Sequence, residues 1–174
     1  DWMRAYFLVF AASTFLGGIC GHAFCRLGDF NWMKMSGWLP GMVATAFLSR
    51  ASAELIRQLA NPSFLKKIIW AIWLILGITM GLMLWSPNFG WVKLNGFLQV
   101  IGLVLPTTFF VFREKRHPGS RFFLWGIGMA TMASLFFSQK ISLHTWFNHA
   151  DASHVFLALA AWFYYRGAVA FSQN

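Results

Sequence analysis

Acidic residues are scarce in this chain. Only five of its 174 residues are Asp or Glu, and charged residues of both signs together make up 11% of the sequence. Hydrophobic residues reach 58%, and they include ten Trp and twenty Phe. A soluble domain of this size carries far more charge on its surface. The composition therefore excludes an ordinary soluble domain and predicts an integral membrane protein.

Cysteine is also scarce, since the chain contains only Cys20 and Cys25. Two cysteines are too few for a metal cluster, and a separation of five residues is a poor spacing for a disulfide on a helix. We therefore predict two ordinary thiols. The chain also lacks an initiator Met and the charged start, short apolar core and cleavage site of a signal peptide. This start is consistent with an N-terminus that lies further upstream.

Long apolar segments account for most of the sequence. From Ala5 to Phe24 no acidic or basic side chain occurs apart from His22, and this length matches the roughly 20 residues that cross a bilayer. Helices are expected because the strands of a membrane barrel would alternate polar and apolar residues. We predict an all-α, multipass transmembrane bundle that forms a single domain over residues 1–174. Its six helices are expected at about 5–25, 37–56, 68–86, 94–112, 121–139 and 153–171.

The chain has a net charge of +9, and its basic residues lie mainly at the ends of these segments and do not form one patch. Membrane topology therefore explains the basic residues better than a nucleic-acid partner does, and we predict no nucleic-acid partner. If the six helices alternate in direction, one side of the membrane collects nine basic residues and the other only four. The positive-inside rule then places the first side, with both termini, in the cytoplasm. The nine are Arg4, Arg57, Lys66, Lys67, Arg113, Lys115, Arg116, Arg121 and Arg166, and the four are Arg26, Lys34, Lys93 and Lys140.

Three local patterns predict how the helices pack. Arg50 precedes Glu54 by four residues and is expected to form an ion pair with it near the cytoplasmic end of its helix. Small residues recur every fourth position from Ser13 to Gly21 and again at Gly77 and Gly81, which predicts close approach of neighbouring helices at both places. Pro106 predicts a kink in the fourth helix.

Histidines at the ends of apolar segments are the residues that most need an explanation. An imidazole in or beside hydrocarbon is costly unless it is hydrogen-bonded, binds a metal or faces water. His22 ends the first segment, which runs outward, and His154 begins the sixth, which runs inward. Both are therefore expected at the same, non-cytoplasmic depth, together with His144, His149 and Asp151.

Several roles are open to these residues. Asp151 and His154 share a helical face if both are helical, whereas His149 would point roughly opposite Asp151. Asp151 is either a helix cap or a ligand or base. His22 and His154 serve helix packing, bind Zn²⁺ with His149 as a third ligand, or hold a b-type haem. With zinc present, Asp151 would be the catalytic residue that positions the metal-bound hydroxide.

The two ends of the chain resemble the membrane hydrolase superfamily of alkaline ceramidases and progestin/adipoQ receptors. Its members have seven transmembrane helices, with Ser-x-x-x-His in helix two and His-x-x-x-His at the start of helix seven. Gly18 to His22 looks like the first motif, and His154 with its apolar continuation looks like the end of the second. Gly18 stands where the family has Ser, and His149 lies one position before the family's first histidine of the pair. This chain would be a divergent member whose first helix is absent.

The resemblance implies a zinc-dependent hydrolase of a lipid amide, with substrate arriving from membrane lipid. The zinc ligands would be His22, His149 and His154. The alternative from another class is a non-catalytic accessory subunit that packs against neighbouring membrane subunits. A b-type haem electron-transfer subunit is the third alternative.

Overall fold

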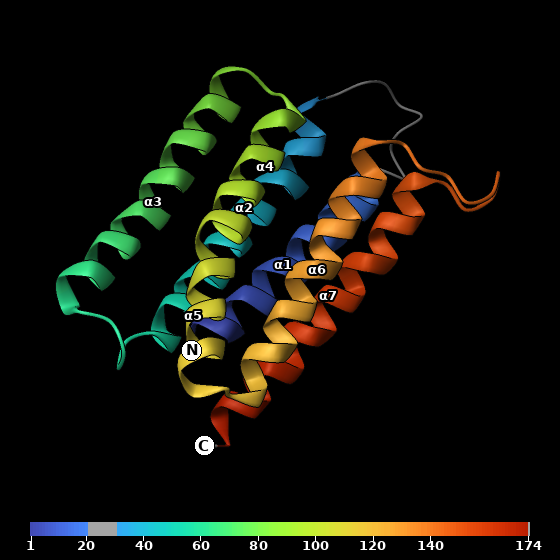
Figure 1. Ribbon diagram of the computed structural model, residues 1–174. Coiled ribbons are helices and arrows are strands. Elements are labelled where there is room, and N and C mark those ends of the chain that lie inside the picture. Colours follow the sequence, from blue (N-terminus) through green and yellow to red (C-terminus); the bar gives the residue numbers. More distant parts are fainter. Residues whose placement is uncertain (21–30, 174) are drawn as a thin grey trace. The chain divides into compact units, whose positions relative to one another are not determined.

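The computed structural model describes residues 1–20 and 31–173, and every structural statement below concerns these residues. They are almost entirely helical, as predicted, and no strand occurs among them. His22 and Cys25 lie outside the described residues. Figure 1 shows the helices in chain order. They are α1 (Trp2–Gly18), α2 (Asn31–Leu55), α3 (Pro62–Trp85), α4 (Phe89–Gly96), the π-helix η3 (Phe97–Val104), α5 (Leu105–Lys115), α6 (Pro118–Ser138) and α7 (His149–Ser172).

Four stretches are long and apolar enough to cross a membrane, judged by length and composition. They are α3, the continuous helix Phe89–Lys115 that contains α4, η3 and α5, then α6 and α7. This is the make-up of an integral membrane protein. The remaining two helices differ: the described part of α1 has 17 residues, and α2 includes Lys34, Arg50 and Glu54.

Polar caps set where the helices begin. The side chain of Asn61 accepts from Ser63 N ahead of Pro62, and Asn88 accepts from Gly90 N. A side chain that accepts from the first free amide groups is the usual start of a helix, and Pro is well suited to the first helical position. Because Asn61 caps it and Pro62 follows, α3 begins about a turn and a half before the predicted residue 68. The basic residues Lys66 and Lys67, which served as the boundary in the prediction, lie inside its first turns.

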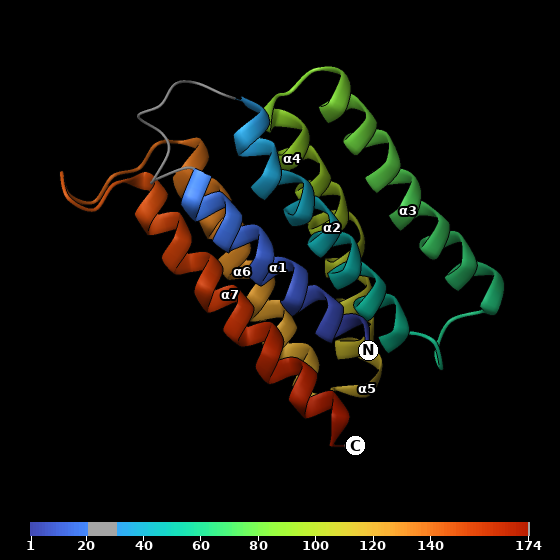
Figure 2. The same cartoon turned by 180° about the vertical axis from the view of Figure 1, so that it is seen from behind.

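Contacts divide the chain into two compact units, Asp1–Val104 and Leu105–Asn174. In the first unit α2 is the central helix and packs against α1, α3, α4 and η3. Figure 2 shows α1 lying along α2. They touch at glycines: a Cβ on Gly37 would lie 2.7 Å from Gly17 Cα, and Ser13 Oγ donates to Gly37 O at 2.7 Å. The close approach predicted from Ser13 and Gly17 is confirmed.

In the second unit α6 and α7 pack along their length, and α5 packs on α6. Glycines again allow the approach, because a Cβ on Gly126 would lie 2.6 Å from the ring of Tyr164 and one on Gly167 would collide with the ring of Phe123. These aromatic rings fill the space that the glycines leave. The prediction of one domain over the whole chain stays a prediction.

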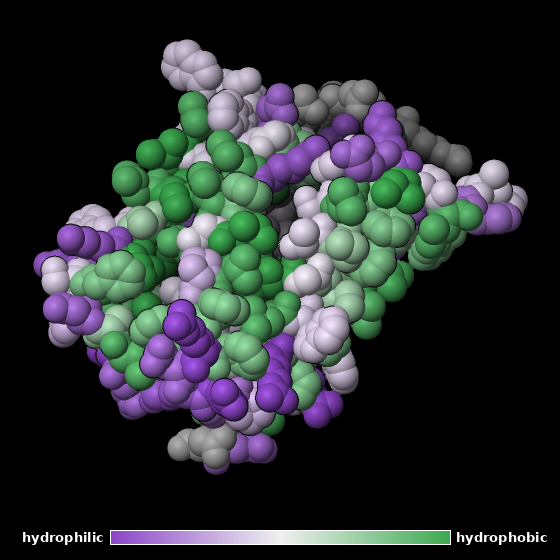
Figure 3. Space-filling model, in the orientation of Figure 1, coloured by the Kyte–Doolittle hydropathy of each residue, from purple (hydrophilic) through white to green (hydrophobic). Residues whose placement is uncertain are grey.

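The predicted packing at Gly77 and Gly81 is wrong for the described residues. No atom among them comes within 4 Å of a Cβ built on either glycine. The face of α3 that carries Gly77 is instead an exposed apolar surface with Trp70, Leu74 and Ile78. Figure 3 shows hydrophobic residues over much of α3. Spacing alone did not distinguish a face that packs within the chain from an exposed apolar face.

Candidate functional site

The start of α7 is fixed by a reciprocal cap. Asn148 Oδ1 accepts from Ala150 N at 2.8 Å and from Asp151 N at 3.3 Å, while Asp151 Oδ2 accepts from Asn148 N at 3.0 Å. Together these bonds form a capping box. The capping role that the sequence offered as one alternative for Asp151 is confirmed, and Asn148 is the N-cap residue. Its second oxygen, Oδ1, makes no hydrogen bond or ion pair with the described residues.

Three of the predicted site residues lie in the first two turns of this helix. His149 is the first residue of α7, Asp151 follows in the same turn, and His154 comes three residues later. At about 100° per residue, Asp151 and His154 lie about 60° apart around the helix axis, and His149 and His154 lie about 140° apart. The helix therefore places Asp151 and His154 on one face and His149 on another.

The surroundings of the two histidines also differ. The ring of His149 is half-buried and lies 5.6 Å from the ring of Phe137. His154 is exposed. His144, in the connection before α7, is exposed and accepts from Trp146 N through Nδ1 at 3.2 Å. His144 thus supports the turn that leads to α7.

A complete metal site does not occur within the described residues. No group of three His, Cys, Asp or Glu side chains among them could hold a metal ion. His22 belongs to the part of the chain outside the description, so its role as a ligand stays a prediction. Cys20 is a free thiol, as expected, and its Sγ lies 3.3 Å from Ser36 Oγ.

A buried polar cluster in the first unit was missed by the sequence analysis. Asn95 Nδ2 donates to Thr45 Oγ1 at 2.7 Å, and Asn95 Oδ1 accepts from Thr79 Oγ1 at 3.1 Å. One turn later, Gln99 Nε2 donates to Ile72 O at 2.9 Å. Both amides are fully buried and connect α2 and α3 to the helix of η3. The spacing of Asn95 and Gln99 in an apolar run was the signal that could have identified them.

Gln99 lies within the π-helix η3, and its Oε1 has no hydrogen-bond partner among the described residues. π-helical turns are uncommon and often mark places where a helix departs from regular packing. The π-helix ends shortly before Pro106, which cannot donate a backbone hydrogen bond. The π-helix was not predicted from the sequence, and the kink expected at Pro106 stays a prediction.

The predicted pair of Arg50 and Glu54 is confirmed, with Nη1 of the arginine 2.5 Å from Oε1 of the carboxylate. Arg57 approaches the other oxygen of Glu54 at 3.3 Å, and the guanidinium of Arg50 lies 5.1 Å from the ring centre of Trp2. The single carboxylate of Glu54 thus pairs with two guanidinium groups, and Arg50 also packs on the ring of Trp2. A structural role at the end of α2 explains them.

The fold and the polar start of its last span define an all-α integral membrane protein. The chain belongs to DUF6962, a family of unknown function, whose family model matches residues 1–173. No curated protein and no solved structure matches the chain.

Proposed function

We propose that the protein is an integral membrane hydrolase that uses zinc at the start of α7 to cleave a lipid amide. The observation that carries the proposal is the pair of Asp151 and His154, which share one face of α7 at the end of a membrane span. An ionisable side chain beside hydrocarbon costs free energy, so such a side chain is a candidate functional residue. The kind of substrate comes from the resemblance to alkaline ceramidases.

The residues present fit part of a zinc site. A carboxylate oxygen and an imidazole nitrogen are both common zinc ligands, and catalytic zinc usually takes three protein ligands. Asp151 has one oxygen held by Asn148 N, which orients the carboxylate and leaves Oδ1 for a metal or a water. On a regular helix His149 is directed away from this face. A further ligand must come from outside the described residues, and His22 is the ligand predicted from the sequence.

Bound zinc would supply a hydroxide at neutral pH, because it lowers the pKa of a bound water to about 7. The chain's own contribution is then orientation and proton transfer. If Asp151 is not a ligand, its Oδ1 is placed to accept a proton from the attacking water. Trp146 and Phe147, both exposed just before α7, give an apolar approach for the long chains of a lipid substrate.

The proposal is tested by fatty-acid release from a ceramide-type amide by the purified protein in lipid nanodiscs. We expect zinc-dependent release that is lost in His154→Ala and Asp151→Asn. The asparagine keeps an oxygen that can accept from Asn148 N, so the cap survives while the charge is lost. His144→Ala is the matched control and should retain activity. Activity that persists in both His154→Ala and Asp151→Asn would contradict the proposal, and a Soret band would instead support the haem alternative.

A second candidate, a non-catalytic accessory subunit, is favoured by one observation. The exposed face of α3 has a hollow of about 380 Å³ at Gly77, lined by Trp70, Trp73, Leu74 and Ile78. Such a hollow beside a glycine could receive a residue of another membrane helix. Gly77→Leu would fill it and should release a bound subunit on native gels of membranes solubilised in mild detergent. An unchanged native size would remove this candidate.

A further inference from the structure

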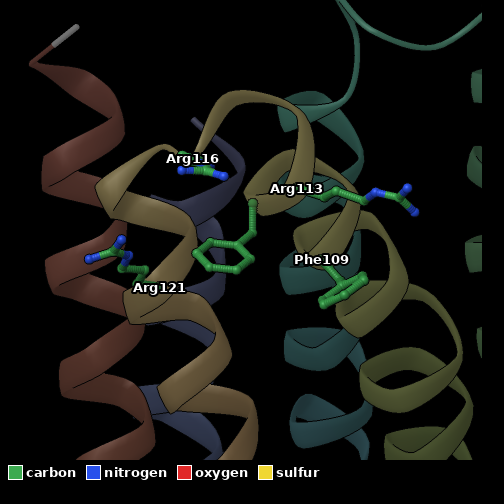
Figure 4. Close-up of a pocket in the computed structure, with 5 residues that line it drawn as sticks. Phe109, Arg113, Arg116 and Arg121 are labelled. Carbon is green, nitrogen blue, oxygen red and sulfur yellow. The ribbon is translucent and has the colours of Figure 1, made fainter.

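Three arginines line a hollow where α5 ends and α6 begins. The hollow has a volume of about 320 Å³ and is lined by Phe109, Phe112, Arg113, Arg116 and Arg121. Figure 4 shows Arg113 and Phe109 on the last turns of α5, Arg116 in the connection and Arg121 on the first turn of α6. All of these residues belong to the second unit.

The three guanidinium groups have no counter-ion in the described part of the chain. None of its ion pairs involves Arg113, Arg116 or Arg121, and no carboxylate lines the hollow. The guanidinium of Arg121 lies 5.9 Å from the ring centre of Phe112, so the charge is placed against an aromatic wall. Figure 4 shows the side chain of Arg113 extending away from Arg116 and Arg121. Arg116 and Arg121, which line the same hollow without a counter-ion among the described residues, favour a bound anion, since guanidinium groups bind phosphate and carboxylate with paired hydrogen bonds.

The backbone around the hollow is held in place by a short connection. Arg116 adopts a left-handed conformation, with φ of 48°, and its N donates to Phe112 O at 3.0 Å. His117 then caps α6, because its Nδ1 accepts from Gly119 N at 3.1 Å, and its ring stacks on Phe171 at 4.3 Å. Arg116 therefore lies in a fixed connection between the two helices that carry Arg113 and Arg121.

The position of the hollow identifies the source of the anion. Phe89–Lys115 and Pro118–Ser138 are both long and apolar enough to span the membrane, so their shared connection lies where the lipid headgroups begin. Phe109 lines the same hollow and is 53% exposed, so it provides an apolar surface beside the charges. A free phosphate would use only the arginines, whereas a phospholipid uses the arginines for its phosphate and the aromatic side chains for its acyl chain. We propose that this hollow binds the headgroup of an anionic phospholipid.

Native mass spectrometry of the full chain in detergent, titrated with phosphatidylglycerol or phosphatidylcholine, tests this proposal. We expect phosphatidylglycerol to bind the wild type and the double variant Arg116→Ala/Arg121→Ala to bind it roughly tenfold more weakly or worse. The control Lys66→Ala/Lys67→Ala removes the same charge at the start of α3, away from the hollow, and should bind as the wild type does. Arg116→Lys/Arg121→Lys should retain part of the binding because it keeps the charge without the paired hydrogen bonds.

Three results would overturn the proposal. An equal loss of lipid binding in Arg116→Ala/Arg121→Ala and in Lys66→Ala/Lys67→Ala would show attraction by net charge alone. Unchanged binding in Arg116→Ala/Arg121→Ala would show that the lipid binds elsewhere. Displacement of the lipid by inorganic phosphate at comparable concentration would show that the acyl chain contributes nothing. Thermal unfolding of each variant, expected to match that of the wild type, separates lost binding from lost folding.

Discussion

Asn95 and Gln99 are one helical turn apart, yet their hydrogen bonding is unequal. Both the NH₂ group and the oxygen of the Asn95 side chain are hydrogen-bonded, whereas Gln99 uses only its NH₂ group and leaves Oε1 without a partner in the described residues. A buried acceptor without a donor costs free energy that an apolar side chain of similar shape would not cost. The two positions should therefore respond differently to the same substitution.

Asn95→Leu is expected to lower the free energy of unfolding by about 1 kcal/mol, because it removes hydrogen bonds between helices. Gln99→Leu is expected to change it by less than about 0.5 kcal/mol, because the lost bond to Ile72 O is offset by removal of the unpaired oxygen. Thermal unfolding of both variants in the same detergent checks this. A loss for Gln99→Leu as large as that for Asn95→Leu would mean that Oε1 has a donor, such as a bound water.

The capping box at the start of α7 can be tested apart from any metal. Asn148→Ala removes the side chain that accepts from two backbone amides and should cost about 1 kcal/mol of stability. Asn148→Ser should restore most of the loss, because Ser is also a good N-cap. If Asn148→Ala unfolds at the wild-type temperature in detergent, the cap contributes nothing and the placement of Asp151 has another cause.

At the scale of helices, two glycines of α6 form a matched pair. A Cβ at Gly126 would lie 2.6 Å from Tyr164, whereas no atom of the described residues comes within 4 Å of a Cβ at Gly128. Gly126→Ala should therefore destabilise the contact between α6 and α7 by about 1–3 kcal/mol. Gly128→Ala should be neutral or stabilise by up to about 1 kcal/mol, because Ala favours the helix more than Gly does. Equal unfolding temperatures for the two variants would contradict this packing.

The helices themselves could be predicted from the sequence, and their packing only in part. Apolar length was sufficient to predict the four spans, because a bilayer leaves few options for the backbone, although α3 begins at Pro62, ahead of the predicted residue 68. Small residues at four-residue spacing predicted a real contact at Gly17 and a false one at Gly77. The spacing of small residues identifies a helix face without large side chains, but the rest of the fold determines whether another helix packs on that face.

The candidate site shows the same division. The cap at Asp151 followed from local sequence, because a helix start depends on residues within one turn. The bonds of Asn95 with Thr45 and Thr79 join residues far apart in the chain, and only folding brings them together. His22 is a third case, since it lies outside the described residues and its predicted role rests on the topology argument and on the resemblance to alkaline ceramidases.

At the scale of the whole molecule, the distribution of basic residues predicts the orientation in the membrane. In a background with Cys20 and Cys25 replaced by Ala, Ser142→Cys should react with a membrane-impermeant thiol reagent on intact cells. Glu114→Cys should react only after the membrane has been opened, because the adjoining ends of α5 and α6 and their connection carry four of the nine basic residues assigned to the cytoplasm. The opposite pattern of labelling would reverse the orientation.

The zinc content of the purified protein decides whether α7 begins at a metal site. We expect about one zinc ion per chain in the wild type and a large loss in His22→Ala and in His154→Ala, with His144→Ala unchanged. Parallel measurements on His149→Ala and Asp151→Asn decide which of these two side chains is a ligand. A wild-type protein that is folded, shown by its cooperative thermal unfolding, and that contains no zinc after purification without chelators would contradict the claim.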